Sequence, residues 1–183
     1  MSERVRRIIA LLLAVGISAF VLAFREDLAA LAGYGYAGIF LITLLSSATV
    51  VLPVPGLALV FAAGASFNPL LVGLAAGVGA GLGELTGYLV GYGGRGTVEN
   101  RPNYGRIRRW MERYGVWVIF AMAAVPNPVF DLAGITAGMM RIPVLLFLLA
   151  AVAGNVLKAT VVAYAGAGTA SLVGPLIQDW LGH

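Results

Sequence analysis

The stretch Pro53-Val54-Pro55-Gly56 interrupts an apolar run that extends from residue 33 to residue 67. Proline lacks the N–H that a helix needs, and it disfavours helix in the residue before it. A membrane-spanning helix needs about 20 residues, and neither half of the run is comfortably that long. Irregular backbone at membrane depth persists only where protein or a watery cavity surrounds it. The pattern therefore favours a re-entrant hairpin, with its tip at Pro53, Pro55 and Gly56, over one kinked span.

A second interruption, Pro126-Asn127-Pro128, breaks the apolar run of residues 115–140 and follows the first by 73 residues. A whole apolar span follows each interruption, at residues 70–92 and from residue 144 to about residue 168. With tips at Pro126 and Pro128 as well, each half of the chain is a broken hairpin followed by a span. Two such hairpins that enter the membrane from opposite faces form an inverted-topology repeat, which is common among transporters.

The composition agrees with a membrane protein and excludes several kinds of site. Hydrophobic residues make up 60% of the 183 residues and charged residues 11%, whereas soluble domains are roughly 45–50% apolar and about 25% charged. There is no cysteine, and His183 is the only histidine, so thiolate chemistry, His-metal clusters and Ser–His pairs are excluded. We predict an all-α polytopic membrane protein without a cofactor or a metal.

The chain divides into five predicted segments. Residues 1–32 contain an apolar run that we interpret as a retained membrane helix, because a signal peptide has an apolar region of only about 7–15 residues. Residues 33–92 and 115–168 are the two hairpin-plus-span repeats. Residues 93–114 form a basic connection between them, and residues 169–183 form a short tail.

The arginine distribution predicts the orientation. If the N-terminus, residues 93–113 and Arg141 are cytoplasmic, then ten of the eleven arginines lie inside and only Arg25 lies outside. The net charge of +4 is thus explained by topology and by contact with lipid head groups, and no nucleic-acid partner is expected. The tail after residue 168 is predicted to lie on the other face.

The basic connection carries a helical pattern. Its apolar residues at helical spacing are Ile107, Trp110, Met111 and Tyr114, and its basic residues on the other side are Arg106, Arg109 and Arg113. This pattern is typical of an interfacial helix whose arginines contact anionic head groups. A solvated basic loop is an equal alternative.

Glycines recur every four residues in the span of residues 70–92. One row consists of Gly73, Gly77 and Gly81, and a second of Gly79, Gly83, Gly87 and Gly91. Small residues at this spacing let helices approach closely in lipid. One dimer seam needs a single row, so we predict that the rows pack on the chain's own hairpins. A homodimer face is the alternative.

Three ionisable residues, Glu84, Asp131 and Lys158, fall in segments that should lie in the membrane. Each costs roughly 2.5–3.5 kcal/mol in a lipid-exposed helix, so each should face a cavity or a partner. A buried ion pair between Asp131 and Lys158, without a transport role, is one alternative. Two acids against one lysine leave a charge uncompensated, however, and this favours a hydrated transport pathway.

Further polar residues are candidates for the same pathway. Asn127 followed by Pro128 matches a helix N-cap with proline at the first helical position. This arrangement puts Asp131 in the first turn, where the helix dipole stabilises a carboxylate. Asn155 and Tyr88 could also line the pathway, although simple helix packing explains each of them at least as well.

Two motifs resemble the DedA/VTT (SNARE-associated Golgi) superfamily over roughly residues 35–168. The motifs are Gly83-Glu84-x-x-x-Tyr88 and Pro126-Asn127-Pro128-x-Phe130-Asp131-Leu132-Ala133-Gly134-Ile135-x-x-Gly138. The second motif, with Pro143, Gly154 and Lys158 beyond it, is most similar to the vacuole membrane protein branch. The resemblance implies paired re-entrant hairpins that move phospholipid or polyprenyl-phosphate head groups between leaflets. The short chain looks prokaryotic, so the expected location is the plasma membrane.

The chain departs from the bacterial DedA pattern in two places. Residues 45–57 contain no acidic residue, and near the second tip alanine or valine occupies positions where arginine is typical, namely Ala123, Ala124, Val125 and Val129. In the family these missing groups are linked to ion coupling and phosphate binding. Their absence favours passive scrambling over a proton-driven polyprenyl-phosphate carrier.

The function expected from these observations is that of a lipid scramblase or flippase, with membrane phospholipids as partners and no enzymatic step. A homo-oligomer is possible. The alternative is a proton- or sodium-coupled secondary transporter of a small solute, with Glu84 or Asp131 as the coupling site. A third interpretation is a structural membrane protein, in which the three ionisable residues serve folding alone.

Overall fold

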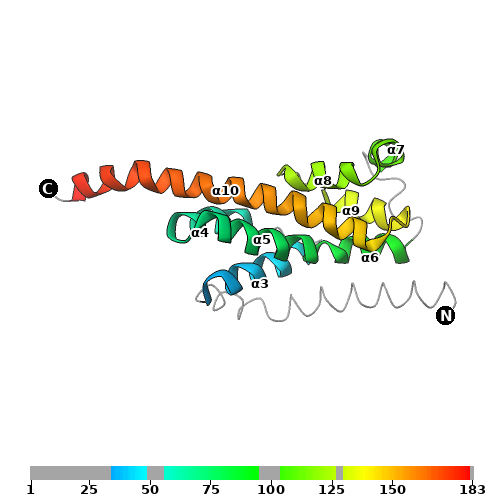
Figure 1. The fold of residues 1–183 in the computed structure, drawn as a ribbon, viewed down its shortest axis with the longest axis horizontal. Helices are drawn as coiled ribbons and strands as arrows, with labels where there is room; N and C mark the ends of the chain where they lie inside the picture. Colours follow the sequence, from blue (N-terminus) through cyan, green and yellow to red (C-terminus); the bar gives the residue numbers. More distant parts are fainter. Residues whose placement is uncertain (1–33, 49–55, 95–103, 127–129, 182–183) are drawn as a thin grey trace.

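The computed structural model describes residues 34–48, 56–94, 104–126 and 130–181. Within these ranges all regular structure is helical, which confirms the all-α prediction for this part of the chain. The helices are α3 (Gly35–Ala48), α4 (Gly56–Ser66), α5 (Pro69–Gly83), α6 (Leu85–Gly93), α7 (Tyr104–Tyr114), α8 (Val116–Ala124), α9 (Phe130–Met139) and α10 (Val144–Leu181) (Figure 1). The predicted N-terminal helix of residues 1–32 lies outside the described residues.

Two helical segments are long and apolar enough to cross a bilayer, namely Pro69–Gly93 and Val144–Thr169. The first combines α5 and α6, which meet at Glu84. Helical hydrogen bonding continues across this junction, because Glu84 N–H donates to the Ala80 carbonyl at 3.1 Å and Tyr88 N–H donates to the Glu84 carbonyl at 3.2 Å. At about 1.5 Å per residue each segment is about 38 Å long, which exceeds a hydrocarbon core of about 30 Å.

The four helices that precede the spans are too short to cross a bilayer. They contain 14 (α3), 11 (α4), 9 (α8) and 10 (α9) residues. After α8 ends at Ala124, Val125 is extended (φ −107°, ψ 134°) and Pro126 is non-helical, as expected for a residue before proline. Gly56, expected in the non-helical first tip, is instead the first residue of α4. Pro53, Pro55, Asn127 and Pro128 lie outside the described residues.

The short helices are exchanged between the two halves of the chain. The first helix of each pair packs on the span of its own half, α3 on α5 and α8 on α10. The second helix of each pair crosses over, so that α4 packs on α10 and α9 packs on α6. The spans α5 and α10 also pack directly on each other. As a result each half completes the packing of the other.

The two glycine rows of the first span make these close approaches possible. The row of Gly73, Gly77 and Gly81 lies on α10, where an added Cβ would collide with Thr160, Val156 and Val152 respectively. In the second row Gly79 and Gly83 lie on α3, and Gly91 lies on α9. Packing of the second row on the chain's own short helices is therefore confirmed. The first row packs on the other span, because the two spans contact each other directly.

Helix α7 lies across the end of the bundle, and Figure 1 shows it end-on while α10 runs across the view. A helix is therefore confirmed for residues 104–114 of the basic connection, whereas residues 95–103 lie outside the described residues. The four apolar residues predicted to share one side of this helix differ in burial, however. Ile107 and Met111 are buried in the core formed with α6, α8, α9 and α10, whereas Trp110 and Tyr114 are exposed.

Candidate functional site

Glu84, Asp131 and Lys158 come together from three helical segments, and we call this cluster the polar site. Glu84 stands at the α5–α6 junction, Lys158 is on α10, and Asp131 is in the first turn of α9, as predicted. Lys158 interacts electrostatically with both carboxylates. Close packing of α5 on α10 positions Glu84 and Lys158, and the crossing of α9 onto α6 brings in Asp131. A Cβ placed on Gly87 of α6 would be 3.7 Å from the Asp131 carbonyl oxygen.

A hydrogen bond from Asn155 holds the Glu84 carboxylate. The Asn155 side chain is 1% exposed, and its Nδ2 donates to Glu84 Oε1 at 3.2 Å and to the Ala151 carbonyl at 3.0 Å. The Ala151 carbonyl can only accept, so it fixes the NH₂ end of the amide toward Glu84. Asn155 therefore belongs to the polar site through direct contact with Glu84.

The other end of the same amide has no partner among the described residues, because Asn155 Oδ1 is buried without a hydrogen bond. A buried, unsatisfied polar atom costs about 1–3 kcal/mol. An acceptor of this kind beside a carboxylate suits a positively charged or hydrogen-bond-donating group.

The three side chains of the polar site differ in their exposure. Asp131 is exposed, and Glu84 and Lys158 are partly exposed. Lys158 interacts with both acids through space, without an ion-pair contact of 4 Å or less to either of these described residues. The arrangement thus differs from the buried Asp131–Lys158 ion pair that the sequence left as an alternative.

Tyr88 lies one helical turn after Glu84 but serves packing. Its ring is 5% exposed and lies 5.0 Å from the ring of Phe147, and its hydroxyl donates to the Ile142 carbonyl at 2.6 Å. These contacts tie α6 to α10 and to the connection between α9 and α10. The structure therefore favours the packing alternative for Tyr88, and its hydroxyl is already engaged away from the polar site.

The remaining predicted site residues fall elsewhere. Arg106, Arg109 and Arg113 are exposed on α7, whereas Asn127 lies outside the described residues. Sequence reasoning missed the Ala151 and Ile142 carbonyls, because backbone acceptors carry no residue-specific signal. It also missed Thr86, which is 2% exposed and donates to the Gly83 carbonyl at 2.6 Å, next to Glu84.

Comparison with known proteins identifies the family. A model of the VTT domain matches residues 54–168, which is more than half of the chain. The vacuole membrane protein KMS1 of Arabidopsis thaliana is 37% identical over 59 residues, which cover 30% of this chain and 14% of that relative. No solved structure matches the chain. On the strength of the domain match over both spans and the polar site, the chain belongs to the VTT domain (DedA) family of membrane proteins.

Proposed function

We propose that this protein is a passive lipid scramblase, which moves phospholipid or polyprenyl-phosphate head groups between leaflets past the polar site. The observation that carries the proposal is the convergence of two carboxylates and one lysine, one from each of the two spans and one from α9, at a partly exposed position. Charges of both signs within a membrane are expensive unless they face water or a polar partner. A passing head group is such a partner.

The chemistry of a zwitterionic head group matches the polar site. Its phosphate pairs with Lys158 and with the N-terminal end of α9, and its amine pairs with Glu84 and Asp131. The unpartnered Asn155 Oδ1 supplies a further acceptor near the amine. No covalent bond forms or breaks in this process, so the protein acts on lipids without being an enzyme.

The proposal includes two re-entrant hairpins, α3 with α4 and α8 with α9, that enter from opposite faces of the membrane. Support comes from the shortness of these helices and from their symmetric exchange between the two spans. The membrane in this proposal is the plasma membrane. With α7 on its cytoplasmic face, the N-terminus is cytoplasmic as well, and the tail of α10 lies on the outer face. Figure 1 shows α7 and the C-terminal end of α10 at opposite ends of the molecule, which supports placing them on opposite faces of the membrane.

Single cysteines are expected to label from opposite sides of the membrane. The chain has no native cysteine, so Gly105→Cys on α7 and Gln178→Cys on α10 each give one reactive position. An added side chain at Gly105 meets nothing within 4 Å, so the substitution should not disturb the fold. In intact right-side-out vesicles an impermeant maleimide should label Gln178→Cys only, and Gly105→Cys should label after permeabilisation. Labelling of both from one side would contradict the proposed topology.

Scrambling is tested by reconstitution into liposomes that contain a fluorescent lipid. Dithionite bleaches the outer leaflet alone in protein-free vesicles, and it should bleach both leaflets when the protein is present. The expected rate is the same with and without an imposed pH or sodium gradient. Protein-containing vesicles that behave like protein-free ones would overturn the proposal.

A second candidate is a proton- or sodium-coupled transporter of a small solute. The contact between Glu84 and the buried Asn155 favours it, because one carboxylate beside an unpartnered amide oxygen can hold a single cation. In the same liposomes this function predicts gradient-dependent solute uptake and no lipid movement. The two functions therefore give opposite results in one preparation.

A further inference from the structure

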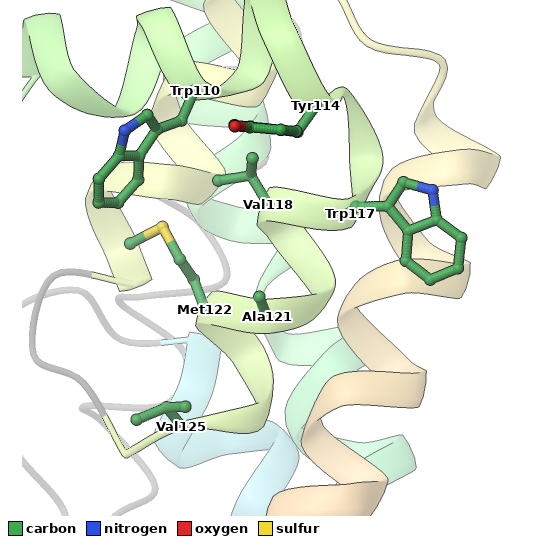
Figure 2. A pocket seen from close by; sticks show the side chains of 7 residues that line it. All are labelled: Trp110, Tyr114, Trp117, Val118, Ala121, Met122 and Val125. Atoms are coloured by element: carbon green, nitrogen blue, oxygen red, sulfur yellow. The ribbon is translucent and has the colours of Figure 1, made fainter.

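A groove lined by apolar and aromatic side chains runs between α7 and α8, away from the polar site. Its lining residues are Trp110, Tyr114, Trp117, Val118, Ala121, Met122 and Val125. Figure 2 shows Trp110 and Tyr114 projecting from α7 above a row of α8 side chains, Val118, Met122 and Val125. The groove has a volume of about 470 Å³.

The dimensions of the groove suit one hydrocarbon chain. Val118 and Val125, the C-terminal cap of α8, are seven positions apart, or about 10 Å at 1.5 Å per residue. One leaflet of a hydrocarbon core of about 30 Å is about 15 Å deep, so the groove accounts for much of this depth. Trp110 and Trp117 are 46% and 72% exposed, and such aromatic side chains are typical of the membrane–water interface.

Positive charge is concentrated at the α7 end of this groove. The Arg113 guanidinium carbon is 5.4 Å from the ring centroid of Tyr114, which lines the groove. The only acid in the sequence of α7, Glu112, pairs with Arg108 at 2.9 Å. The charges of Arg106, Arg109 and Arg113 are therefore uncompensated within α7, and all three side chains are exposed.

We propose that the α7–α8 groove binds one anionic phospholipid, with an acyl chain along Val118, Met122 and Val125 and its phosphate on Arg109 and Arg113. The cationic end and the apolar row together match an amphiphile with a negative head group. Figure 1 shows α7 across the end of the bundle. In the proposed orientation α7 therefore lies at head-group level, and the groove extends from it along α8 toward the membrane interior. This lipid is resident and anchors α7 to the membrane surface. The site does not depend on scrambling through the polar site.

Quenching of tryptophan fluorescence by brominated lipids tests this site. Trp180→Phe leaves Trp110 and Trp117 as the only tryptophans, and both line the groove. The protein is reconstituted in phosphatidylcholine, a small fraction of which is replaced by dibrominated phosphatidylglycerol or dibrominated phosphatidylcholine. We expect dibrominated phosphatidylglycerol to reach half-maximal quenching at a roughly tenfold lower fraction than dibrominated phosphatidylcholine. Two arginines near an anionic head group together give at least that preference.

Two sets of variants separate head-group binding from general contact with lipid. Arg109→Gln with Arg113→Gln should abolish the preference, whereas Arg4→Gln with Arg6→Gln, which removes the same charge elsewhere in the sequence, should retain it. A reporter at Leu149→Trp, with all native tryptophans changed to Phe, should show no preference, because Leu149 is 60% exposed on α10. Ala121→Leu should weaken quenching by filling the groove.

Other outcomes would overturn the site. Equal quenching by both brominated lipids at every fraction would mean that the groove meets bulk lipid only. Weak quenching by both lipids, together with disulfide-linked dimers of Ala121→Cys, would mean that a second copy of the chain covers the groove. A preference that survives the Arg109 and Arg113 changes would place the head group elsewhere.

Discussion

Changing Glu84 to glutamine is expected to slow scrambling in proteoliposomes about tenfold, which corresponds to about 1.4 kcal/mol in the barrier. The glutamine oxygen can still accept the hydrogen bond that Asn155 Nδ2 donates to Glu84 Oε1 at 3.2 Å. The substitution therefore removes a negative charge and preserves both side-chain size and contact. The rate at which dithionite bleaches lipid of the inner leaflet measures the effect.

Glu112→Gln is the matched control for this experiment. Glu112 is an exposed acid on α7 that pairs with Arg108, so the same chemical change is made away from the polar site. The control should scramble at the wild-type rate, and Asp131→Asn added to Glu84→Gln should slow scrambling further. If that double variant is folded and scrambles normally, neither carboxylate takes part in lipid movement.

Changing Lys158 to methionine is expected to lower both the scrambling rate and the free energy of unfolding. Lys158 is the cation that interacts with both Glu84 and Asp131, so its loss leaves two carboxylates without a positive partner. We expect a destabilisation of about 1–2 kcal/mol, below the about 3–5 kcal/mol of a broken, fully buried ion pair, because Asp131 is exposed and Glu84 and Lys158 are only partly buried. Thermal unfolding in detergent measures the stability.

Neutralising the whole polar site separates charge balance from lipid binding. The triple variant Glu84→Gln, Asp131→Asn, Lys158→Met has no unbalanced charge in the polar site, so its stability should return toward that of the wild type. Scrambling should remain slow, because neither the phosphate nor the amine of a head group finds a charged partner. If stability and scrambling both recover, the three residues are a structural cluster and the proposed function is wrong.

The positions of the helices and their breaks could be predicted because they depend on local sequence. Pro126 ends α8, and the length of an apolar run decides whether a helix can span a bilayer. Spacing also predicted that the Gly79 row would pack on short helices. The same spacing did not reveal that Gly77 packs on α10, because two equally spaced rows on one helix give no information about which partner each row meets.

The polar site could be predicted only as a set of residues. Membrane depth alone singled out Glu84, Asp131 and Lys158, since a charge there needs a partner. The contact between Asn155 and Glu84 joins residues 71 positions apart and depends on how the spans pack. Tyr88 was a candidate because it follows Glu84 by one turn, yet its hydroxyl is taken up by a backbone carbonyl that no sequence pattern reveals. Trp110 faces outward because Ile107 and Met111 already fill the core beneath α7.

The crossing of α4 onto α10 and of α9 onto α6 has a consequence for assembly. Each half of the chain contributes one short helix to the packing of the other half, as two chains do in a domain-swapped dimer, but here within one molecule. Two chains can therefore exchange halves and form the same α4–α10 and α9–α6 interfaces between molecules. The choice between a closed monomer and a swapped dimer then rests on the connection between the halves, so shortening residues 95–103 shifts the protein toward the dimer.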